Sequence, residues 1–173
     1  MYCSRILHKG YRVLIAFLVS IVNYSYPVLS STIIAIGPYQ LKIAATPQNR
    51  IQGLQGVRHI PKNTGMLFVY PDPTKAVYWM YGCYTAMDII FLDVTGKVQS
   101  IIPAMPPNAR GLLPEQYTRY TANGPMSANQ AKYATLPKTA YVVEVALGEG
   151  INFAKTNTRL IPKAIAKAGI NAI

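Results

Sequence analysis

The sequence predicts a mainly β protein: a small sandwich or barrel-like domain of about seven strands with two or three short helices. Three observations indicate this fold class. Apolar residues fall in short stretches of roughly four to eight residues, and glycines and prolines separate these stretches. Two of the stretches flank a hairpin turn. The domain has no long segment with a helical period, which disfavours an alternating α/β fold.

The expected strands are apolar or alternating stretches bounded by turn residues. Pro71 and Pro73 are expected to end the third of them, because proline lacks the N–H that a ladder needs. Gly96 supplies the positive φ of the hairpin turn between the fifth and the sixth. In order, the strands are residues 32–36, 39–43, 65–70, 76–80, 88–93, 97–102 and 139–146.

Two short helices have recognisable ends. Thr46 is a good N-cap and Pro47 fits the first turn, so a helix is expected to start there and to end by about Gly56. A second helix is expected over residues 162–168, with proline in its first turn and Gly169 after its end.

The segment 103–137 has no strand or helix period. It contains six prolines, and polar residues separate them. The sequence therefore predicts a long loop here. Loops of this length inside a compact domain are uncommon, and they are typical of functional or of mobile segments.

The first thirty residues have the pattern of a secretory signal. Three basic residues precede an apolar run over residues 13–22, and a polar, turn-forming stretch follows. The run is shorter than the roughly 20 residues of a membrane-spanning helix. A cleavage after Ser30 would leave one domain, residues 31–173, in the periplasm or outside the cell. An uncleaved segment that anchors the domain to the membrane is the alternative.

The protein is basic. Its formal net charge is +11, and the part after residue 30 has 14 Lys and Arg against 6 acids, or +8. This charge favours anionic partners such as a membrane surface. Four bases at four-residue intervals in the tail would suit such a surface if the tail were one helix, but Pro162 interrupts it. The other bases are scattered, as on an ordinary solvated surface. Nucleic acid is not an expected partner, because no basic cluster or recognition helix is present. The tail bases are Lys155, Arg159, Lys163 and Lys167.

Cysteine and histidine are scarce. Cys83 is the single cysteine after residue 30, so no internal disulfide is expected; it either pairs with a second chain or is buried and inert. His59 is the single histidine there, and nothing in the spacing makes it the partner of a nucleophilic cysteine. Clustered metal ligands and a glycine-rich phosphate loop are also lacking, so no metal or cofactor is expected.

Several segments in a fixed order resemble the family known as domain of unknown function 192. This resemblance covers roughly residues 41–150 and implies a compact, mainly β domain without an established reaction. The chain departs from the family pattern at Gln55, where methionine is usual, at residues 81–83, where Lys-Asn-Thr is usual, and at Pro107, where a Pro-Cys pair often ends. The segments that carry the resemblance are residues 46–54, 65–71, 79–80, 88–98 and 141–145.

Two carboxylates are the candidates for catalysis. Asp88 begins a strand, and Glu144 lies within the last one, on the face opposite Val143 and Val145. Two acids at about 5–9 Å from each other can hydrolyse a glycosidic bond. The alternative is structural: Asp88 caps a turn, and Glu144 pairs with a neighbouring Lys or Arg.

An aromatic segment is the candidate for ligand binding. Trp79 and the three tyrosines of residues 78–84 could form a stacking platform for a sugar or peptide, with Arg50 and Asp88 as polar anchors. Of these tyrosines, Tyr81 and Tyr84 are the better candidates for exposure. The alternative places Trp79 and its neighbour Met80 in the core, as is usual for aromatic strands.

These patterns favour a non-catalytic exported module that binds, or assists the binding of, a cell-envelope ligand such as a small molecule or glycan. The main alternative is a glycan or ester hydrolase that acts through Asp88 and Glu144. A third hypothesis is a structural partner of another envelope protein, in which the loop 103–137 becomes ordered on contact. The sequence does not define the oligomeric state.

Overall fold

The computed structural model describes residues 32–106, 118–126 and 137–172. The expected signal segment, residues 1–30, lies outside the described residues, as do residues 107–117 and 127–136 of the expected long loop. In the described part of the chain, no helix is long and apolar enough to cross a membrane.

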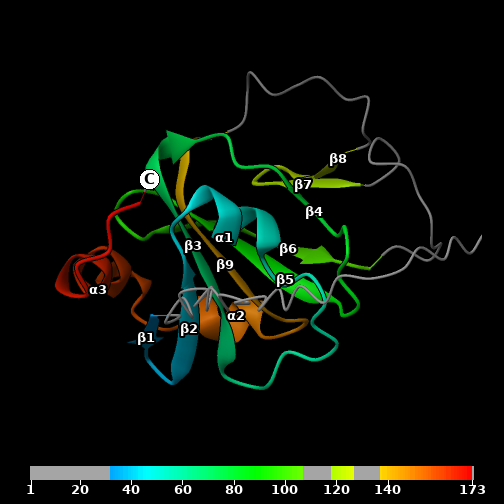
Figure 1. Cartoon of the computed structure of the whole chain (residues 1–173), viewed down its shortest axis with the longest axis horizontal. Helices are drawn as coiled ribbons and strands as arrows, with labels where there is room; N and C mark the ends of the chain where they lie inside the picture. Colours follow the sequence, from blue (N-terminus) through cyan, green and yellow to red (C-terminus); the bar gives the residue numbers. More distant parts are fainter. Residues whose placement is uncertain (1–31, 107–117, 127–136, 173) are drawn as a thin grey trace, which may run out of the picture. The chain divides into compact units, whose positions relative to one another are not determined.

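The described residues form a mainly β structure of nine strands in two sheets, with short helices (Figure 1). The larger sheet has the order β1-β2-β3-β9-β5-β6, and the smaller has the order β4-β7-β8. Because β1 and β6 are the edges of the larger sheet, it does not close into a barrel. The strands are β1 (Ile33–Ile36), β2 (Tyr39–Ala44), β3 (Thr64–Thr74), β4 (Tyr78–Trp79), β5 (Met87–Leu92), β6 (Val98–Ala104), β7 (Arg119–Thr121), β8 (Gly124–Met126) and β9 (Thr139–Ala146).

Only β2 and β3 run parallel among the strand pairs of the described residues; the other pairs are antiparallel. β9 is central, and it lies between β3 and β5. Six of its eight residues are buried, so both of its faces are covered. This burial is the reason why a simple alternation of apolar and polar residues is weak in this strand.

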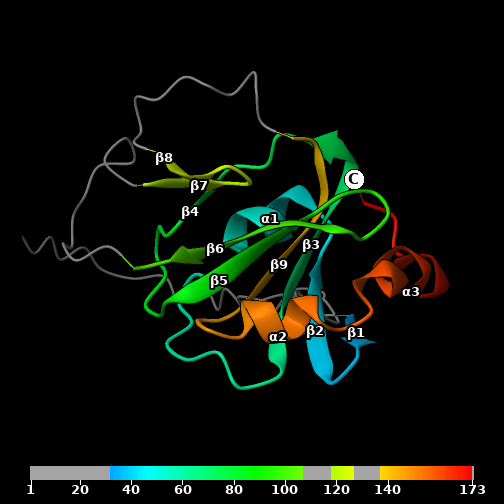
Figure 2. The ribbon, with the colours of Figure 1, turned by 180° about the vertical axis from the view of Figure 1, so that it is seen from behind.

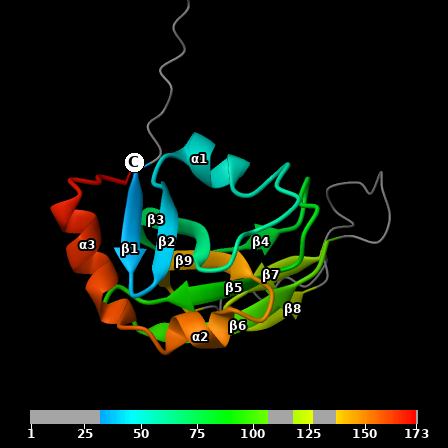
Figure 3. The same cartoon turned by 90° about the horizontal axis from the view of Figure 1, so that it is seen from below.

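Each face of the larger sheet has its own hydrophobic core. On one face, α2 (Gly150–Ala154) and α3 (Ile161–Lys167) contribute Phe153, Ile161 and Ile165. The other face is covered by the smaller sheet and by the segment that follows α1 (Pro47–Gln52). Figure 2 and Figure 3 show α1 on the opposite side of the larger sheet from α2.

The smaller sheet packs through its tyrosines. The ring of Tyr78 in β4 meets Phe68 and Phe91 edge-on, at centroid distances of 5.1 and 5.9 Å. Tyr120 in β7 is also buried, and its hydroxyl accepts a hydrogen bond from the backbone N–H of Met105 at 3.3 Å. The result is a second layer on one face of the larger sheet, which confirms the mainly β prediction.

Three local expectations were inaccurate. Strand β3 continues past Pro71 and Pro73, because these prolines lie in an irregular stretch between Val69 and Thr74 where no ladder hydrogen bond is required. Strand β4 is shorter than the predicted 76–80. Strands β7 and β8 occur inside the predicted long loop, and Pro125 is tolerated there because β8 is an edge strand.

The helix expected over residues 162–168 is confirmed by α3. The tail as a whole is divided among α2, the 3₁₀ helix η3 (Thr158–Leu160) and α3, so its four bases do not form the stripe of one helix.

Candidate functional site

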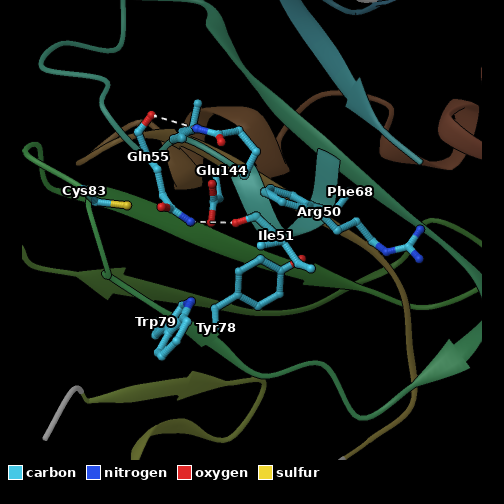
Figure 4. A pocket seen from close by; sticks show the side chains of 11 residues that line it. Arg50, Ile51, Gln55, Phe68, Tyr78, Trp79, Cys83 and Glu144 are labelled. Atoms are coloured by element: carbon cyan, nitrogen blue, oxygen red, sulfur yellow. Dashed lines mark hydrogen bonds between the residues drawn. The ribbon is translucent and has the colours of Figure 1, made fainter. Parts of the chain in front are cut away.

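A small cleft lies beside the C-terminal end of α1, on the face of the larger sheet that carries the smaller sheet (Figure 4). Its volume is about 40 Å³, whereas one water molecule needs about 10–15 Å³. The cleft therefore has room for a few atoms of a ligand but not for a whole sugar ring. We call it the α1 cleft; it is lined by Arg50, Ile51, Gln52, Gly53, Leu54, Gln55, Phe68, Tyr78, Trp79, Cys83 and Glu144.

Glu144 is the acid of the α1 cleft. It lies in the central strand β9, opposite Met66 of β3 and Ile89 of β5, and its side chain is only 6% exposed. Its carboxyl forms no hydrogen bond or ion pair with any residue that the structure describes. Burial raises the pKa of this carboxyl from 4.5 to about 8. Glu144 is therefore mostly protonated at neutral pH in the free protein.

The helix α1 and the turn after it form one edge of the cleft. Thr46 caps the helix as expected, because its hydroxyl accepts a hydrogen bond from the N–H of Asn49 at 3.2 Å. Gly53 ends the helix with a φ of 47°. The side-chain amide of Gln55 then donates to the carbonyl of Ile51 at 2.7 Å, which fixes the turn over the cleft (Figure 4).

Arg50 lines the cleft, but its guanidinium points away from Glu144 (Figure 4). The guanidinium donates to the carbonyls of Ala45 and Val69, at 2.6 and 3.0 Å, and it lies 5.4 Å from the centroid of the Tyr70 ring. These contacts tie α1 to β3 and to the residue that follows β2. Arg50 therefore positions the edge of the cleft and is not the ion-pair partner of Glu144.

A pair of tyrosines supports the floor of the cleft. The hydroxyls of Tyr70 and Tyr78 share a hydrogen bond of 2.8 Å. Burial raises the pKa of both phenols above the usual value. Both side chains are therefore neutral over the physiological range, and Tyr78 presents an uncharged aromatic surface beside Glu144.

Trp79 forms one wall. The residue is 39% exposed. Its ring stacks on Tyr81 at a centroid distance of 5.4 Å, and the guanidinium of Arg119 lies 4.7 Å from the ring centroid. These neighbours cover parts of the ring that a stacked sugar would need. The aromatic platform predicted from the sequence is therefore already partly occupied by side chains of the protein itself.

Cys83 completes the wall next to Trp79. Burial, and secondly the charge of Glu144, raise the pKa of its thiol to about 12. Its sulfur lies 3.7 Å from the carbonyl of Tyr81, as a weak donor. A thiol with so high a pKa is a poor nucleophile, because the thiolate is the reactive form.

The structure brings together three of the residues predicted from the sequence: Arg50, Trp79 and Glu144 all line the α1 cleft. Tyr81 adjoins them through its contact with Trp79. Tyr84 is not among the lining residues; it is 53% exposed and its ring carries the guanidinium of Arg58 at 4.7 Å.

Asp88 is placed elsewhere. It pairs with Val145 along the ladder, on the other face of the sheet from Glu144, and its carboxylate accepts hydrogen bonds from the N–H groups of Gly148 and Gly150, at 2.9 and 2.8 Å. This is the turn-capping role that was the structural alternative for Asp88. The structure does not bring Asp88 and Glu144 together at one substrate, so the paired-acid hydrolysis mechanism has no geometric support.

Sequence reasoning missed several residues of the cleft. Gln55 and Cys83 were noted as departures from a family pattern but were not predicted as a site, and Phe68 was predicted only as a strand residue; Tyr78 belonged to the predicted aromatic segment but was not among its exposed candidates. No spacing rule relates these positions, because they come from four different parts of the chain. Within the described residues, no group of three or more His, Cys, Asp or Glu side chains could hold a metal ion.

The fold and the cleft define a mainly β domain with one buried acid beneath a short helix. Comparison with known families then gives its membership: the profile of DUF192, a family described as an uncharacterized ACR, matches residues 32–152, so the chain belongs to this family. The resemblance inferred from the sequence is thereby confirmed. No match was found among curated proteins.

Two solved structures are similar. One is a protein of unknown function from Novosphingobium aromaticivorans, with 21% sequence identity, a TM-score of 0.53, and coverage of 75% of this chain and 84% of that one. The other is a putative transcription regulator from Sinorhizobium meliloti, with 20% identity, a TM-score of 0.45, and coverage of 78% and 77%. The similarity to the Novosphingobium aromaticivorans structure supports the fold alone.

The segments that carry the family resemblance converge on the α1 cleft. Of the five segments, four contribute lining residues: Arg50, Gly53 and Leu54 from the first, Phe68 from the second, Trp79 from the third and Glu144 from the last. Gln55 and Cys83, at which the chain departs from the family pattern, line the same cleft. The cleft is thus lined both by residues that match the family pattern and by residues at which this chain departs from it.

Proposed function

We propose that this protein is an exported, non-catalytic binding module that holds part of a small cell-envelope ligand in the α1 cleft. The supporting observation is the state of Glu144, which is buried in a cleft without a partner among the described residues. A buried polar group without a partner destabilises a protein by roughly 1–3 kcal/mol. A ligand that bonds to this carboxyl at the cleft would offset part of such a cost, which supports a binding role for the cleft.

A binding role fits the chemistry around the cleft better than catalysis does. The neighbouring thiol of Cys83 has a raised pKa, and the two carboxyls proposed for hydrolysis lie on opposite faces of the sheet. The cleft combines one acid and a few other polar side chains with apolar and aromatic ones, which is the usual composition of a small-molecule site.

Trp79 provides the measurement that tests this proposal, because it is the single tryptophan of the chain and it lines the cleft. A panel of envelope fragments (amino sugars, short peptides, amines and small acids) is screened by the shift of its indole resonance. We expect at least one class to shift this resonance in the wild type and not in Glu144→Gln. Asp72→Asn, at an exposed acid, is the matched control and should behave as the wild type. A panel with no effect on Trp79 would refute the role of the cleft.

Export is the second part of the proposal, and it rests on the basic and apolar pattern of residues 1–30. Cell fractionation and N-terminal sequencing test it. We expect a mature chain that begins at Ser31 in the periplasmic or extracellular fraction, or an uncleaved chain in the membrane fraction. An intact chain dissolved in the cytosol would contradict the expected localisation.

A further inference from the structure

Glu144 is the acid that lines the α1 cleft, and the arginine there is already engaged. The guanidinium of Arg50 points away and binds two backbone carbonyls (Figure 4). Gln55 uses its amide N–H on the carbonyl of Ile51. The ionisable group of the cleft that is left to meet a charged ligand is therefore the buried carboxyl of Glu144.

The other wall of the cleft is aromatic, through Phe68, Tyr78 and Trp79. Aromatic faces attract cations, and the protein already uses this attraction next to the cleft. The guanidinium of Arg119 lies 4.7 Å from the centroid of Trp79, and that of Arg50 lies 5.4 Å from Tyr70. A carboxyl among aromatic rings is a suitable environment for an organic cation. The rings exclude water, and they do not form strong hydrogen bonds that would compete with the cation for the carboxylate.

Resting on the function proposed above, we propose that the α1 cleft recognises the ammonium group of a small organic amine, with Glu144 as its counter-ion. The volume of about 40 Å³ suits a group of two or three heavy atoms, so the cleft takes the amine end of a ligand. The remainder of the ligand lies outside, beside the exposed side chains of Ile51 and Tyr81.

Binding of a cation must be coupled to the proton of Glu144. The free carboxyl is protonated at neutral pH because burial raises its pKa to about 8, and an ammonium ion displaces that proton to solvent. The charged or titratable groups around this carboxyl are Arg50 on α1, Tyr70 on β3, Tyr78 on β4 and Cys83 in the following turn. The thiol and the phenols have raised pKa values, so they stay neutral from pH 6.5 to 8.5, and Arg50 stays charged. Glu144 is then the group that gives ammonium binding its pH dependence.

The experiment compares methylammonium with methanol, which has the same number of heavy atoms and no charge. Both are titrated into the full-length protein at constant ionic strength, and the fluorescence and the indole resonance of Trp79 are recorded. A ligand of two heavy atoms binds with a Kd of roughly 10 mM at best. At pH 8.5 we expect methylammonium to bind at least about 10-fold more tightly than methanol. Between pH 8.5 and 6.5 its affinity should fall by roughly 20-fold, as Glu144 becomes protonated.

Two variants complete the test. Glu144→Gln should abolish both the preference for methylammonium and its pH dependence, whereas Asp72→Asn should keep both. If methanol binds as well as methylammonium, or if methylammonium binding is independent of pH, the cleft is a site for neutral ligands and the ammonium assignment is wrong. The same holds if neither compound affects Trp79 while another class of the envelope panel does. In each of these cases the binding function itself stands, because it is tested by the panel and not by methylammonium.

Discussion

Asp88 and Glu144 lie on adjacent strands, β5 and β9, but their side chains point to opposite faces of the six-stranded sheet. Asp88 pairs with Val145 and Glu144 with Ile89, one step apart along the same ladder. Since alternate residues of a strand face opposite sides, this single step separates the two carboxyls by the thickness of the sheet. The carboxylate of Asp88 is hydrogen-bonded within the fold, whereas the carboxyl of Glu144 lines the α1 cleft.

The first prediction concerns Asp88. Its carboxylate accepts hydrogen bonds from two N–H groups at the turn before α2. Asp88→Asn replaces these charge-assisted bonds with weaker ones, and we expect a loss of about 1–3 kcal/mol in the free energy of unfolding, measured by urea denaturation. Asp72→Asn, at an exposed site, should change stability by less than about 0.5 kcal/mol. Ligand effects on Trp79 should survive in folded Asp88→Asn; their loss there would indicate a role of Asp88 in the site.

The second prediction concerns the pH dependence of stability. The pKa of Glu144 is raised in the folded state, so above pH 4.5 the unfolded chain loses a proton that the folded protein keeps until about pH 8. Stability should therefore fall as pH rises through this window and then level off, by up to roughly 4–5 kcal/mol from this group. Urea denaturation from pH 5 to 9 measures it. Glu144→Gln should flatten the curve and exceed the wild type in stability at pH 9; a wild-type curve that rises over this window and matches the variant would disprove the burial effect.

The fold was predictable where local chemistry and burial agree. The strand over residues 139–146 was predicted with the bounds that the structure has, and Thr46 caps α1 as its sequence position indicates. The strands β7 and β8 were missed because each has only three residues, too few for a period, and because Pro125 is acceptable at an edge. Helix α2 was missed because its N-terminus is capped by Asp88, which is 62 residues distant in the sequence.

The candidate site was predictable only in part. Glu144 could be singled out from the sequence as an acid within a strand, but a strand residue has two possible sides and two possible neighbours. The choice depends on β9 being central, with β3 and β5 beside it, which is a property of the sheet order and not of the strand. The approach of α1 over Glu144 is likewise a tertiary contact, which no spacing in the chain records. Arg50 and Trp79 were predicted as ligand residues, but only the structure shows that backbone carbonyls engage Arg50 and that the guanidinium of Arg119 lies over Trp79.

The third prediction concerns the thiol of Cys83. Burial and the nearby Glu144 raise its pKa to about 12, so very little thiolate is present at pH 8. In a Cys3→Ser background, we expect iodoacetamide to label native Cys83 at least about 100-fold more slowly than the same cysteine in 8 M urea, as followed by mass spectrometry. Glu144→Gln should change this rate only modestly, because burial is the larger cause. A native rate equal to that of the unfolded chain would contradict the burial of this thiol.

The last prediction concerns the contact between the β5–β6 hairpin and the tail. Gly96 has a φ of 76°, and a Cβ there would collide with the backbone carbonyl of Thr158. The guanidinium of Arg159 also donates to the hydroxyl of Thr95 at 2.7 Å, so η3 is held against this turn. Gly56 is the matched control, because its φ is 82° and a Cβ there would meet nothing within 4 Å.

Gly56→Ala should therefore report the backbone strain alone, about 1 kcal/mol, whereas Gly96→Ala adds the steric clash and should destabilise by a further 1–3 kcal/mol or so. Urea denaturation of both variants measures the difference. Hydrogen exchange should also show faster exchange of the amides of α3 in Gly96→Ala only, since the tail must move to relieve the clash. Equal losses in the two variants, with α3 unchanged, would mean that the tail does not pack against the hairpin in solution.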